Sequence, residues 1–410
     1  MSLNFIKNTA FYSSAYQFLC LGCIFVLVFN KVFSTSFLDV SLLRHFVRTI
    51  CYVLAAVNLV VFIKEKNYKI CLIFLSCLFV GFLCKQFSSS NQILYFCLFT
   101  FAFAKVNYRK AVFVFIITVS ICFLTIVTTS CLELLDAYSF RFRDGELRNA
   151  FGFRHPNALG GIVFFLIMTI WTYSKNCLKN DLLFILILII ASCFIGTFVD
   201  SRTAQYMCIF ASIIITSTIA LNKLLQKELF FSSSLVKWLL RSSFLVIALI
   251  TFDLGYLYSN DSQIFVFIND LLSGRLSLSK NAIINFSITP FGQVLKLSDL
   301  DSIGIEYSAS VSYQVLDSFY MSVIFNYGIV GLLIYCFMYD LIMKKAIINR
   351  DKKLIITLFC FAIYGISESF IGVICFNIFL YLSLSYHSQR ENIDSKLNNT
   401  KNYSSRILNE

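Results

Sequence analysis

Long apolar runs alternate with short polar connections along the whole sequence. Several runs approach the about 20 residues that an α-helix needs to cross about 30 Å of hydrocarbon. Every backbone polar group in hydrocarbon has to be satisfied within the protein, which favours uninterrupted helices. Only two prolines occur in 410 residues, so few runs are broken. With 58% hydrophobic and 14% charged residues, the pattern predicts an all-α integral membrane protein and excludes a soluble globular domain.

Hydropathy divides the chain into about twelve apolar segments. The first run has no small-residue cleavage site after it, so we interpret it as a retained anchor and not as a signal peptide. The fourth segment and the last two are short enough to be re-entrant. We predict one polytopic membrane domain over residues 1–386 and a polar tail over 387–410. The predicted spans are residues 15–29, 46–63, 70–84, 93–104, 112–129, 159–172, 182–199, 204–221, 244–258, 321–338, 354–366 and 371–384.

Basic residues in alternate connections orient the predicted bundle. Loops on the cytoplasmic side carry an excess of lysine and arginine, and every second connection here is short and basic. Both termini are then cytoplasmic. The formal net charge of +12 is mostly loop basicity, so we predict no nucleic-acid-binding surface. Representative residues of these connections are Lys64, Lys105, Lys175, Lys223 and Lys344.

The fifteen cysteines fall mostly within the predicted spans. A buried free cysteine behaves as a small apolar residue. The sequence shows neither paired extracellular cysteine spacing nor a C-x-x-C pair outside the apolar runs. We therefore expect no disulfide framework and no zinc site.

The connections on the outward side are longer, mixed in charge and rich in polar motifs. They comprise a loop over about residues 130–158, the tight FVDSRTAQ connection, the longest polar segment over about 259–316, and the ISES turn near the C-terminus. The longest segment lies between the ninth and tenth predicted helices. Any chemistry is therefore predicted outside the cytoplasm.

Each of these polar motifs also has a purely structural interpretation. Pro156 suits the first turn of a helix, so His155 and Asn157 could simply mark a helix start. The pairs Asp200–Ser201 and Asp317–Ser318 suit the N-caps of the helices that follow, and a capping role is also possible for Asp317 alone. Isolated arginines at a membrane edge often extend toward the headgroups, and a late glutamate could lie in a solvated turn.

The number of outward arginines is harder to explain one residue at a time. Basic residues are normally retained on the cytoplasmic side, and apart from Lys280 and Lys296 there is little lysine among them. A guanidinium group suits bidentate contact with phosphate or carboxylate. Several around one pocket could bind a pyrophosphate and stabilise the charge that develops as it leaves. The outward arginines are Arg141, Arg143, Arg148, Arg154, Arg202 and Arg275.

Short motifs on this side resemble those of the bacterial polysaccharide polymerases of the Wzy type, which are related to O-antigen ligases. The matching motifs are FGFRHPNALGG at 151–161, DSRTA at 200–204, SGR at 273–275, DSFYMSVIFNYGIVG at 317–331 and the ISES turn. Residues 280–315 match poorly. Ligase-type members carry a histidine in the late region and this chain has none near Asp317, which favours a polymerase.

The resemblance implies a glycosyltransferase of the GT-C type in the bacterial cytoplasmic membrane, independent of metal and of cofactors. Such polymerases transfer a growing glycan from its polyprenyl pyrophosphate to a sugar hydroxyl of a new lipid-linked oligosaccharide, on the outer face of the membrane. The product is a capsule, an exopolysaccharide or an O-antigen. A flippase and a chain-length regulator of the same pathway are expected as partners, beside the lipid bilayer itself.

Two alternatives remain open. One is a ligase, which attaches a finished glycan to another acceptor. The other is from a different class, a lipid-linked oligosaccharide flippase. A transporter should bury ionisable residues midway along its helices, whereas the predicted spans are nearly free of charge, with Asp253 as one of few exceptions.

The leaving group of the implied reaction identifies candidate cations. Without a metal, side chains have to neutralise the departing pyrophosphate. Arg202 and Arg275 are the first candidates, and Arg148 and Arg154 are next.

The acceptor hydroxyl needs a base, or at least a group that positions it. His155 is the strongest candidate because the unperturbed pKa of histidine lies near neutrality. Asp317, Glu368 and Asp200 are alternatives, so the sequence leaves the base open. Asn157 could hold a sugar hydroxyl.

Overall fold

The computed structural model describes residues 2–38, 44–143, 146–225, 233–295 and 316–386. The predicted tail over 387–410 and residues 296–315 of the predicted long loop lie outside this part. Nine helices of the described part are long and apolar enough to cross a membrane, which confirms the all-α membrane class. They are α1 (Ser2–Phe33), α2 (Arg44–Lys64), α3 (Tyr68–Ser88), α5 (Tyr108–Cys131), α6 (Pro156–Tyr173), α7 (Leu178–Phe194) continued by η1 (Ile195–Val199), α8 (Arg202–Leu225), α10 (Ser234–Leu257) and α13 (Phe319–Ile348).

The other three predicted spans are shorter in the structure. They correspond to α4 (Gln92–Ala102), to α14 (Lys352–Tyr364), and to η3 (Ser369–Gly372) with the single turn α15 (Ile378–Tyr381). At 1.5 Å per residue, α4 and α14 are about 16 and 20 Å long, less than the thickness of the hydrocarbon layer. The count of twelve spans is therefore not confirmed.

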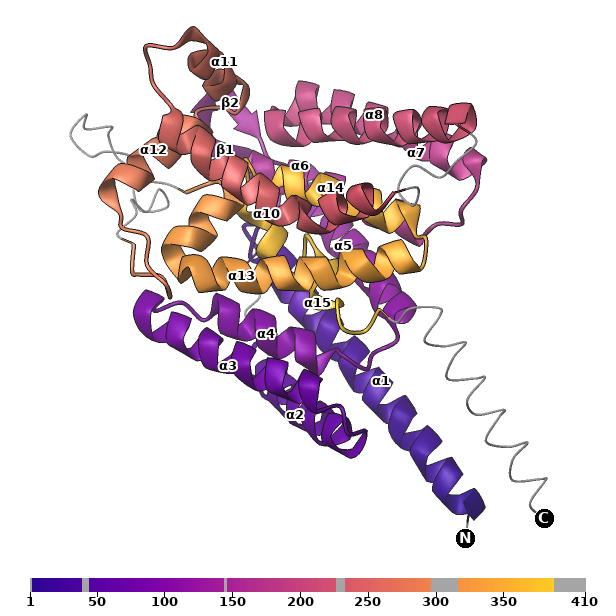
Figure 1. Ribbon diagram of the computed structural model, residues 1–410. Helices are drawn as coiled ribbons and strands as arrows, with labels where there is room; N and C mark the ends of the chain where they lie inside the picture. Colours follow the sequence, from indigo (N-terminus) through magenta and orange to yellow (C-terminus); the bar gives the residue numbers. More distant parts are fainter. Residues whose placement is uncertain (1, 39–43, 144–145, 226–232, 296–315, 387–410) are drawn as a thin grey trace.

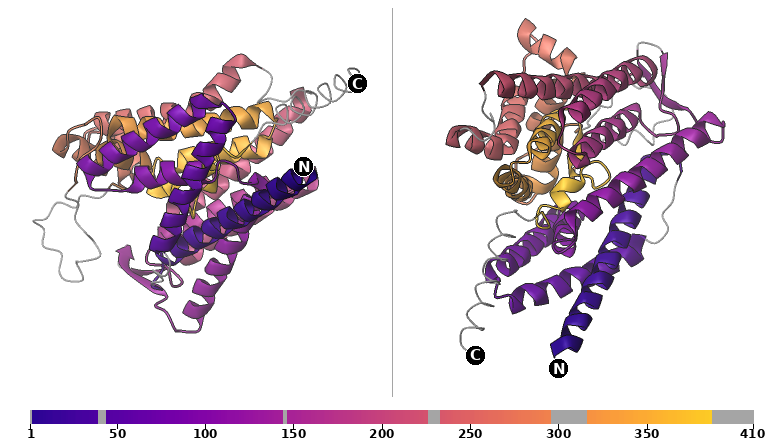
Figure 2. Two further views of the ribbon diagram at one scale, coloured as in Figure 1. Left: turned by 90° about the horizontal axis from the view of Figure 1, so that it is seen from below. Right: turned by 90° about the vertical axis from the view of Figure 1, so that its right-hand side faces the viewer.

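Helix packing places α14 inside the bundle, where it contacts α6, α8, α10 and α13. Aromatic rings fill this interface. The ring of Phe164 on α6 stacks on Tyr364 of α14 at 5.4 Å, and Phe165 lies 4.3 Å from Phe361. The helices α2 and α3 lie on the opposite side of the bundle from α7 and α8 (Figures 1 and 2).

The outer surface of the bundle is apolar. Large apolar side chains such as Leu72 and Phe79 on α3 and Leu186 on α7 are more than half exposed. Contiguous exposed apolar surface of this kind is unfavourable in water and suits contact with lipid. The lipid bilayer is thus an expected neighbour of the described helices.

Polar elements gather at one end of the bundle, toward the left of Figure 1. An antiparallel hairpin of β1 (Tyr138–Arg143) and β2 (Glu146–Asn149) precedes α6. The short helices α11 (Gln263–Leu271) and α12 (Arg275–Asn285) form the first part of the predicted long loop. The sequence predicted both regions only as loops.

Helix α13 is interrupted at Gly328, whose φ of 74° and ψ of −178° are not helical. The segment after α12 packs against this interruption. The backbone amides of Ile329 and Val330 donate to the carbonyls of Thr289 and Pro290, at 3.2 and 3.1 Å. These bonds replace helical ones that α13 loses, and they connect the chain after α12 to the middle of the bundle.

Candidate functional site

Six polar residues from six separate segments form a continuous network at the polar end of the bundle. It runs from an aspartate through an arginine, an asparagine, a glutamate and a second arginine to another aspartate. Apart from Arg148 and Asn157, which are nine residues apart, long stretches of sequence separate the members, so the fold and not the local sequence assembles them. We call this network the polar cluster; its members are Asp200, Arg148, Asn157, Glu368, Arg275 and Asp317.

Asn157 lies at the centre of the polar cluster. Its Nδ2 donates to Oε1 of Glu368 at 2.6 Å. Its Oδ1 accepts from Nη2 of Arg148 and from Oγ of Ser201, both at 3.2 Å. Donors on one side and an acceptor on the other fix the orientation of this amide. In the structure, the Asn157 side chain forms hydrogen bonds with these protein groups. That it holds a sugar hydroxyl, as expected from the sequence, stays a prediction.

The first arginine of the polar cluster, Arg148, lies in strand β2. Its guanidinium is 9% exposed and lies 3.5 Å from the carboxylate of Asp200, which is 40% exposed. The same guanidinium donates to the backbone carbonyl of Asp200. Asp200 itself has a left-handed backbone with φ of 51° and joins η1 to α8. This turn aims its carbonyl at Arg148, so the contact depends on backbone geometry as well as on charge.

The second arginine, Arg275, is the first residue of α12. A left-handed Ser273–Gly274 pair starts this helix. The Nη2 of Arg275 lies 3.0 Å from Glu368 and 3.1 Å from Asp317. Its Nε and Nη1 donate to the carbonyls of Ser367 and Ser273 at 3.3 and 2.9 Å. The guanidinium, 12% exposed, is therefore held by four groups.

Glu368 is the most deeply buried carboxyl group of the polar cluster, with its side chain 6% exposed. It lies in the turn before η3, outside the nine candidate spans. Burial raises the pKa of Glu368 to about 7, because desolvation and the nearby Asp317 outweigh the stabilising contacts with Arg275 and Asn157. A carboxyl group with this pKa can accept or release a proton near neutral pH.

The HPN motif begins α6 and places Asn157 in the polar cluster. His155 is the N-cap residue, and its Nδ1 accepts from the backbone amide of Asn157 at 3.0 Å. Pro156 occupies the first turn, where its missing N–H removes no helical bond. The structural interpretation of His155 and Pro156 is confirmed, and a catalytic role for His155 stays a prediction.

The glycines of the NALGG motif let neighbouring segments approach α6. A Cβ on Gly160 would lie 2.9 Å from Oγ of Ser201 and 2.8 Å from Cβ of Ala204. A Cβ on Gly161 would lie 3.0 Å from the ring of Phe370. The two glycines thus bring the start of α8 and the η3 segment against the first turns of α6.

Other predicted residues lie at the edge of the polar cluster or away from it. Arg202 is exposed at the first residue of α8. Arg154 is also exposed, and its Nε donates to the carbonyl of Ser36 after α1, at 2.8 Å. The side chains of Arg141 and Arg143 lie outside the described part. Of the four predicted cations, Arg148 and Arg275 are therefore the two that belong to the polar cluster, with side chains 9% and 12% exposed.

The structural interpretation of Asp317 as a helix cap is not what the structure shows. The N-cap residue of α13 is Ser318, and the Asp317 carboxylate, 29% exposed, pairs with Arg275. Asp200 likewise precedes the residue before α8 and pairs with Arg148. Both aspartates lie at the more exposed ends of the polar cluster.

Two features of the polar end were missed by sequence reasoning. Ser201 was considered only as a cap, yet its hydroxyl donates to Asn157. A group of Lys31, Arg48 and Asn30 lines a cavity next to η3. No sequence motif contains these residues, because Asn30 and Lys31 belong to α1 and Arg48 belongs to α2. Only the DSR motif could have drawn attention to Ser201.

Within the described residues, no group of three or more His, Cys, Asp or Glu side chains is placed to hold a metal ion. The carboxyl groups of the polar cluster instead face guanidinium groups. Two arginines that are largely shielded from solvent, with a carboxyl group of near-neutral pKa, can bind an anion and exchange a proton with a nearby hydroxyl. No family model, no curated protein and no solved structure matches this chain.

Proposed function

We propose that this protein is a membrane glycosyltransferase that polymerises lipid-linked oligosaccharide repeat units. The observation that carries the proposal is the connection of buried Glu368 to Arg275 directly and to Arg148 through Asn157, at one end of an apolar bundle. The reaction needs a proton acceptor beside cations that receive a pyrophosphate. The polar cluster contains both within one hydrogen-bonded network.

In the proposed reaction, the hydroxyl oxygen of the acceptor sugar forms a bond to the anomeric carbon of the donor glycan. The bond from that carbon to the pyrophosphate oxygen breaks, and the pyrophosphate leaves with the electron pair. The proton of the hydroxyl passes to Glu368. Arg275 and Arg148 stabilise the negative charge that develops on the leaving group.

The charges of the polar cluster allow a pyrophosphate to replace carboxylates as the partner of the arginines. Two guanidinium groups face three carboxyl groups, one of which titrates near pH 7. This pairing keeps the arginines balanced when no substrate is bound. The carboxylates of Asp200 and Asp317 are 40% and 29% exposed, so a pyrophosphate can replace them as partners of the arginines at modest desolvation cost.

The distribution of cations supports an outward position of the polar cluster. At the opposite ends of α6 and α14, Lys353 donates to the carbonyl of Lys175 at 3.0 Å and pairs with Asp181 at 3.1 Å. Basic connections of this kind belong to the cytoplasmic side. We therefore propose cytoplasmic termini and a polar cluster open to the outer face of a bacterial cytoplasmic membrane.

The proposal is tested with the purified full-length protein in lipid nanodiscs. Given only a lipid-linked repeat unit, it should produce a ladder of lipid-linked products that differ by whole repeat units, resolved by gel or mass spectrometry. No lengthening, together with transfer to an added lipid acceptor, would identify a ligase instead. In closed vesicles that contain the protein, movement of the substrate across the membrane without any lengthening would identify a flippase.

The rate of this reaction should depend on the ionisation of Glu368. A base works in its deprotonated form, so the rate should rise with pH through about 7 and level off above it. One pH unit below that pKa, only about a tenth of the Glu368 side chains are ionised, so the rate should fall about tenfold. Measuring the turnover of repeat units between pH 5.5 and 8.5 checks this.

Two variants assign the titrating group. Asp317→Asn removes a charge that raises the pKa of Glu368, so the acid limb of the profile should shift to lower pH. His155→Asn keeps a good N-cap and should leave the limb in place. A limb that disappears in His155→Asn and persists in Glu368→Gln would give the base role to His155.

A further inference from the structure

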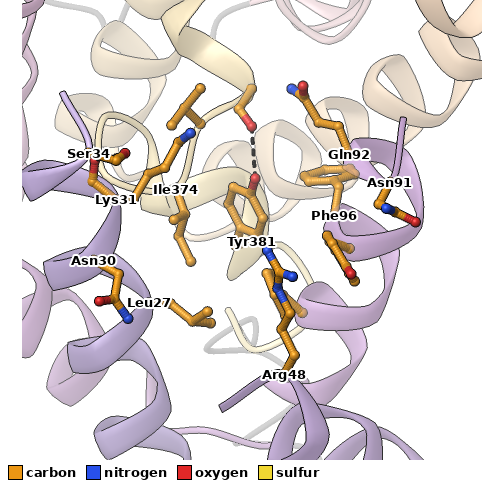
Figure 3. Close-up of a pocket in the computed structure, with 14 residues that line it drawn as sticks. Leu27, Asn30, Lys31, Ser34, Arg48, Asn91, Gln92, Phe96, Ile374 and Tyr381 are labelled. Atoms are coloured by element: carbon orange, nitrogen blue, oxygen red, sulfur yellow. Dashed lines mark hydrogen bonds between the residues drawn. The ribbon is translucent and has the colours of Figure 1, made fainter. Parts of the chain in front are cut away.

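A cavity of about 570 Å³ lies near the polar cluster, on the far side of η3. Residues of α1, α2 and α4 line it together with α15 and the segment after η3 (Figure 3). Its volume falls within the range of about 300–1,000 Å³ typical of sites for small molecules. Gly372, four residues after Glu368, forms part of its wall, so the cavity and the polar cluster lie at the two ends of one short segment.

The cavity wall is positively charged. Lys31, in the last turn of α1, and Arg48 of α2 both line it, and none of the described lining residues is acidic. The guanidinium carbon of Arg48 lies 4.6 Å from the centre of the Tyr95 ring, which holds it in place. The dipole of α1 explains a lysine at its C-terminal end but does not explain an arginine of another helix facing the same space.

A buried amide in this wall has no hydrogen-bond partner. Asn30 is 5% exposed, and its Nδ2 is buried without an acceptor. An unsatisfied buried donor destabilises the folded protein, and Asn30 also lines the cavity, so a ligand that accepts from this amide would relieve that cost. The start of α4 adds further donors, because the Asn91 side chain makes no capping bond there and Asn91 and Gln92 both line the cavity. A helix N-terminus attracts anions.

The same cavity also has an apolar side, formed by Leu27, Phe96 and Phe99. A small hydrophilic anion would leave these side chains without a complementary partner. An amphiphile would match both sides, with its anionic group at the cations and the start of its hydrocarbon chain at the aromatic rings.

We propose that this cavity binds the phosphate-bearing end of a lipid. This lipid is a separate molecule from the one whose pyrophosphate the polar cluster would bind. Lys31 and Arg48 contact the phosphate, the Asn30 amide donates to one of its oxygens, and the first carbons of the chain lie against Phe96 and Phe99. The inference goes beyond glycan transfer, since it does not require that the polar cluster catalyse any reaction.

Binding is measured on the full-length protein in mild detergent by native mass spectrometry, with farnesyl pyrophosphate as the probe. Farnesol reports on the apolar part alone and inorganic pyrophosphate on the anion alone. The double variant Lys31→Gln/Arg48→Gln should bind farnesyl pyrophosphate at least about tenfold more weakly than wild type. The matched control is Lys85→Gln, which removes an exposed cation at the end of α3 and should change nothing.

A second variant separates binding from folding. Asn30→Leu removes the unsatisfied amide, so the melting temperature should stay level or rise while the affinity for farnesyl pyrophosphate falls. Equal affinity of wild type and the double variant would overturn the proposal. So would inorganic pyrophosphate binding as tightly as the probe, which indicates a site for free phosphate, or farnesol binding as tightly, which indicates an apolar pocket.

The two sites are told apart by the number of bound molecules. If the polar cluster also binds pyrophosphate, wild type binds two copies of the probe, and Arg275→Lys loses the copy that the double variant retains. A single copy that depends on Lys31 and Arg48 but not on Arg275 would support the cavity and count against the proposed function.

Discussion

Replacing Arg275 by lysine should reduce polymer formation by at least about a hundredfold. Removal of one preorganised donor to a developing anion typically costs a factor of about 100–1,000 in rate. Arg275 contacts Glu368, Asp317 and two carbonyls at once, which a lysine ammonium cannot reproduce from a single point. Loss of the guanidinium hydrogen bond to Glu368 also raises the pKa of Glu368 further, because that bond lowers it. A larger fraction of the base would then be protonated at pH 7.

The measurement is the rate of conversion of a lipid-linked repeat unit, normalised to folded protein. Arg241→Lys is the matched control: Arg241 of α10 makes a bidentate pair with Asp340 of α13, at 2.6 and 3.0 Å, away from the polar cluster. It should retain most of the activity. If both variants lose activity equally, the effect of Arg275 is one of stability. A full ladder from folded Arg275→Lys would remove this arginine from the reaction.

Loss of a buried ion-pair partner can also unfold the protein, at a cost of about 3–5 kcal/mol when the remaining charge is fully buried. Glu368 approaches this case, since it is 6% exposed. The double variant Arg275→Gln/Glu368→Gln removes both charges and should recover much of the stability lost in Arg275→Gln alone. It should not recover activity. This combination separates the structural role of Arg275 from its role toward a ligand.

Hydropathy predicted where the helices lie better than how many cross the membrane. It reports that a segment avoids water, and an apolar helix enclosed by other helices satisfies that condition as well as one in lipid. Helix α14 illustrates this: ten of its thirteen residues are buried, yet it is too short to span. The β1–β2 hairpin left no comparable signal, because its alternation extends over only a few residues.

The members of the polar cluster were predicted singly, and their pairing was not. Asn157 and Glu368 are 211 residues apart in sequence, and no periodicity relates positions that distant. The same limit explains Arg154. It adjoins the HPN motif in sequence, but the Ser36–Phe153 bridge directs its guanidinium to the end of α1.

The second large effect concerns the interruption of α13: Gly328→Ala should destabilise the protein by roughly 2–6 kcal/mol. The φ of 74° and ψ of −178° are open essentially only to glycine, and a side chain there costs about 1–3 kcal/mol in strain. An added Cβ would also lie 2.3 Å from the carbonyl oxygen of Pro290 and 2.5 Å from that of Thr289. Backbone atoms cannot turn aside as side chains can, so overpacking adds about 1–3 kcal/mol.

The measurement is the melting temperature of the purified variant, with Gly22→Ala as the control. Gly22 lies within α1, and a Cβ there would meet no atom within 4 Å. That variant should be neutral or slightly stabilised, because alanine favours the helix over glycine by about 1 kcal/mol. Equal melting temperatures of the two variants would show that the backbone at Thr289 and Pro290 moves away from the added Cβ without loss of stability. If Gly328→Ala melts lower, the repulsion at Thr289 and Pro290 acts on the connection that leads back to α12. The folded fraction of this variant should then lose activity as well, because Arg275 is the first residue of that helix.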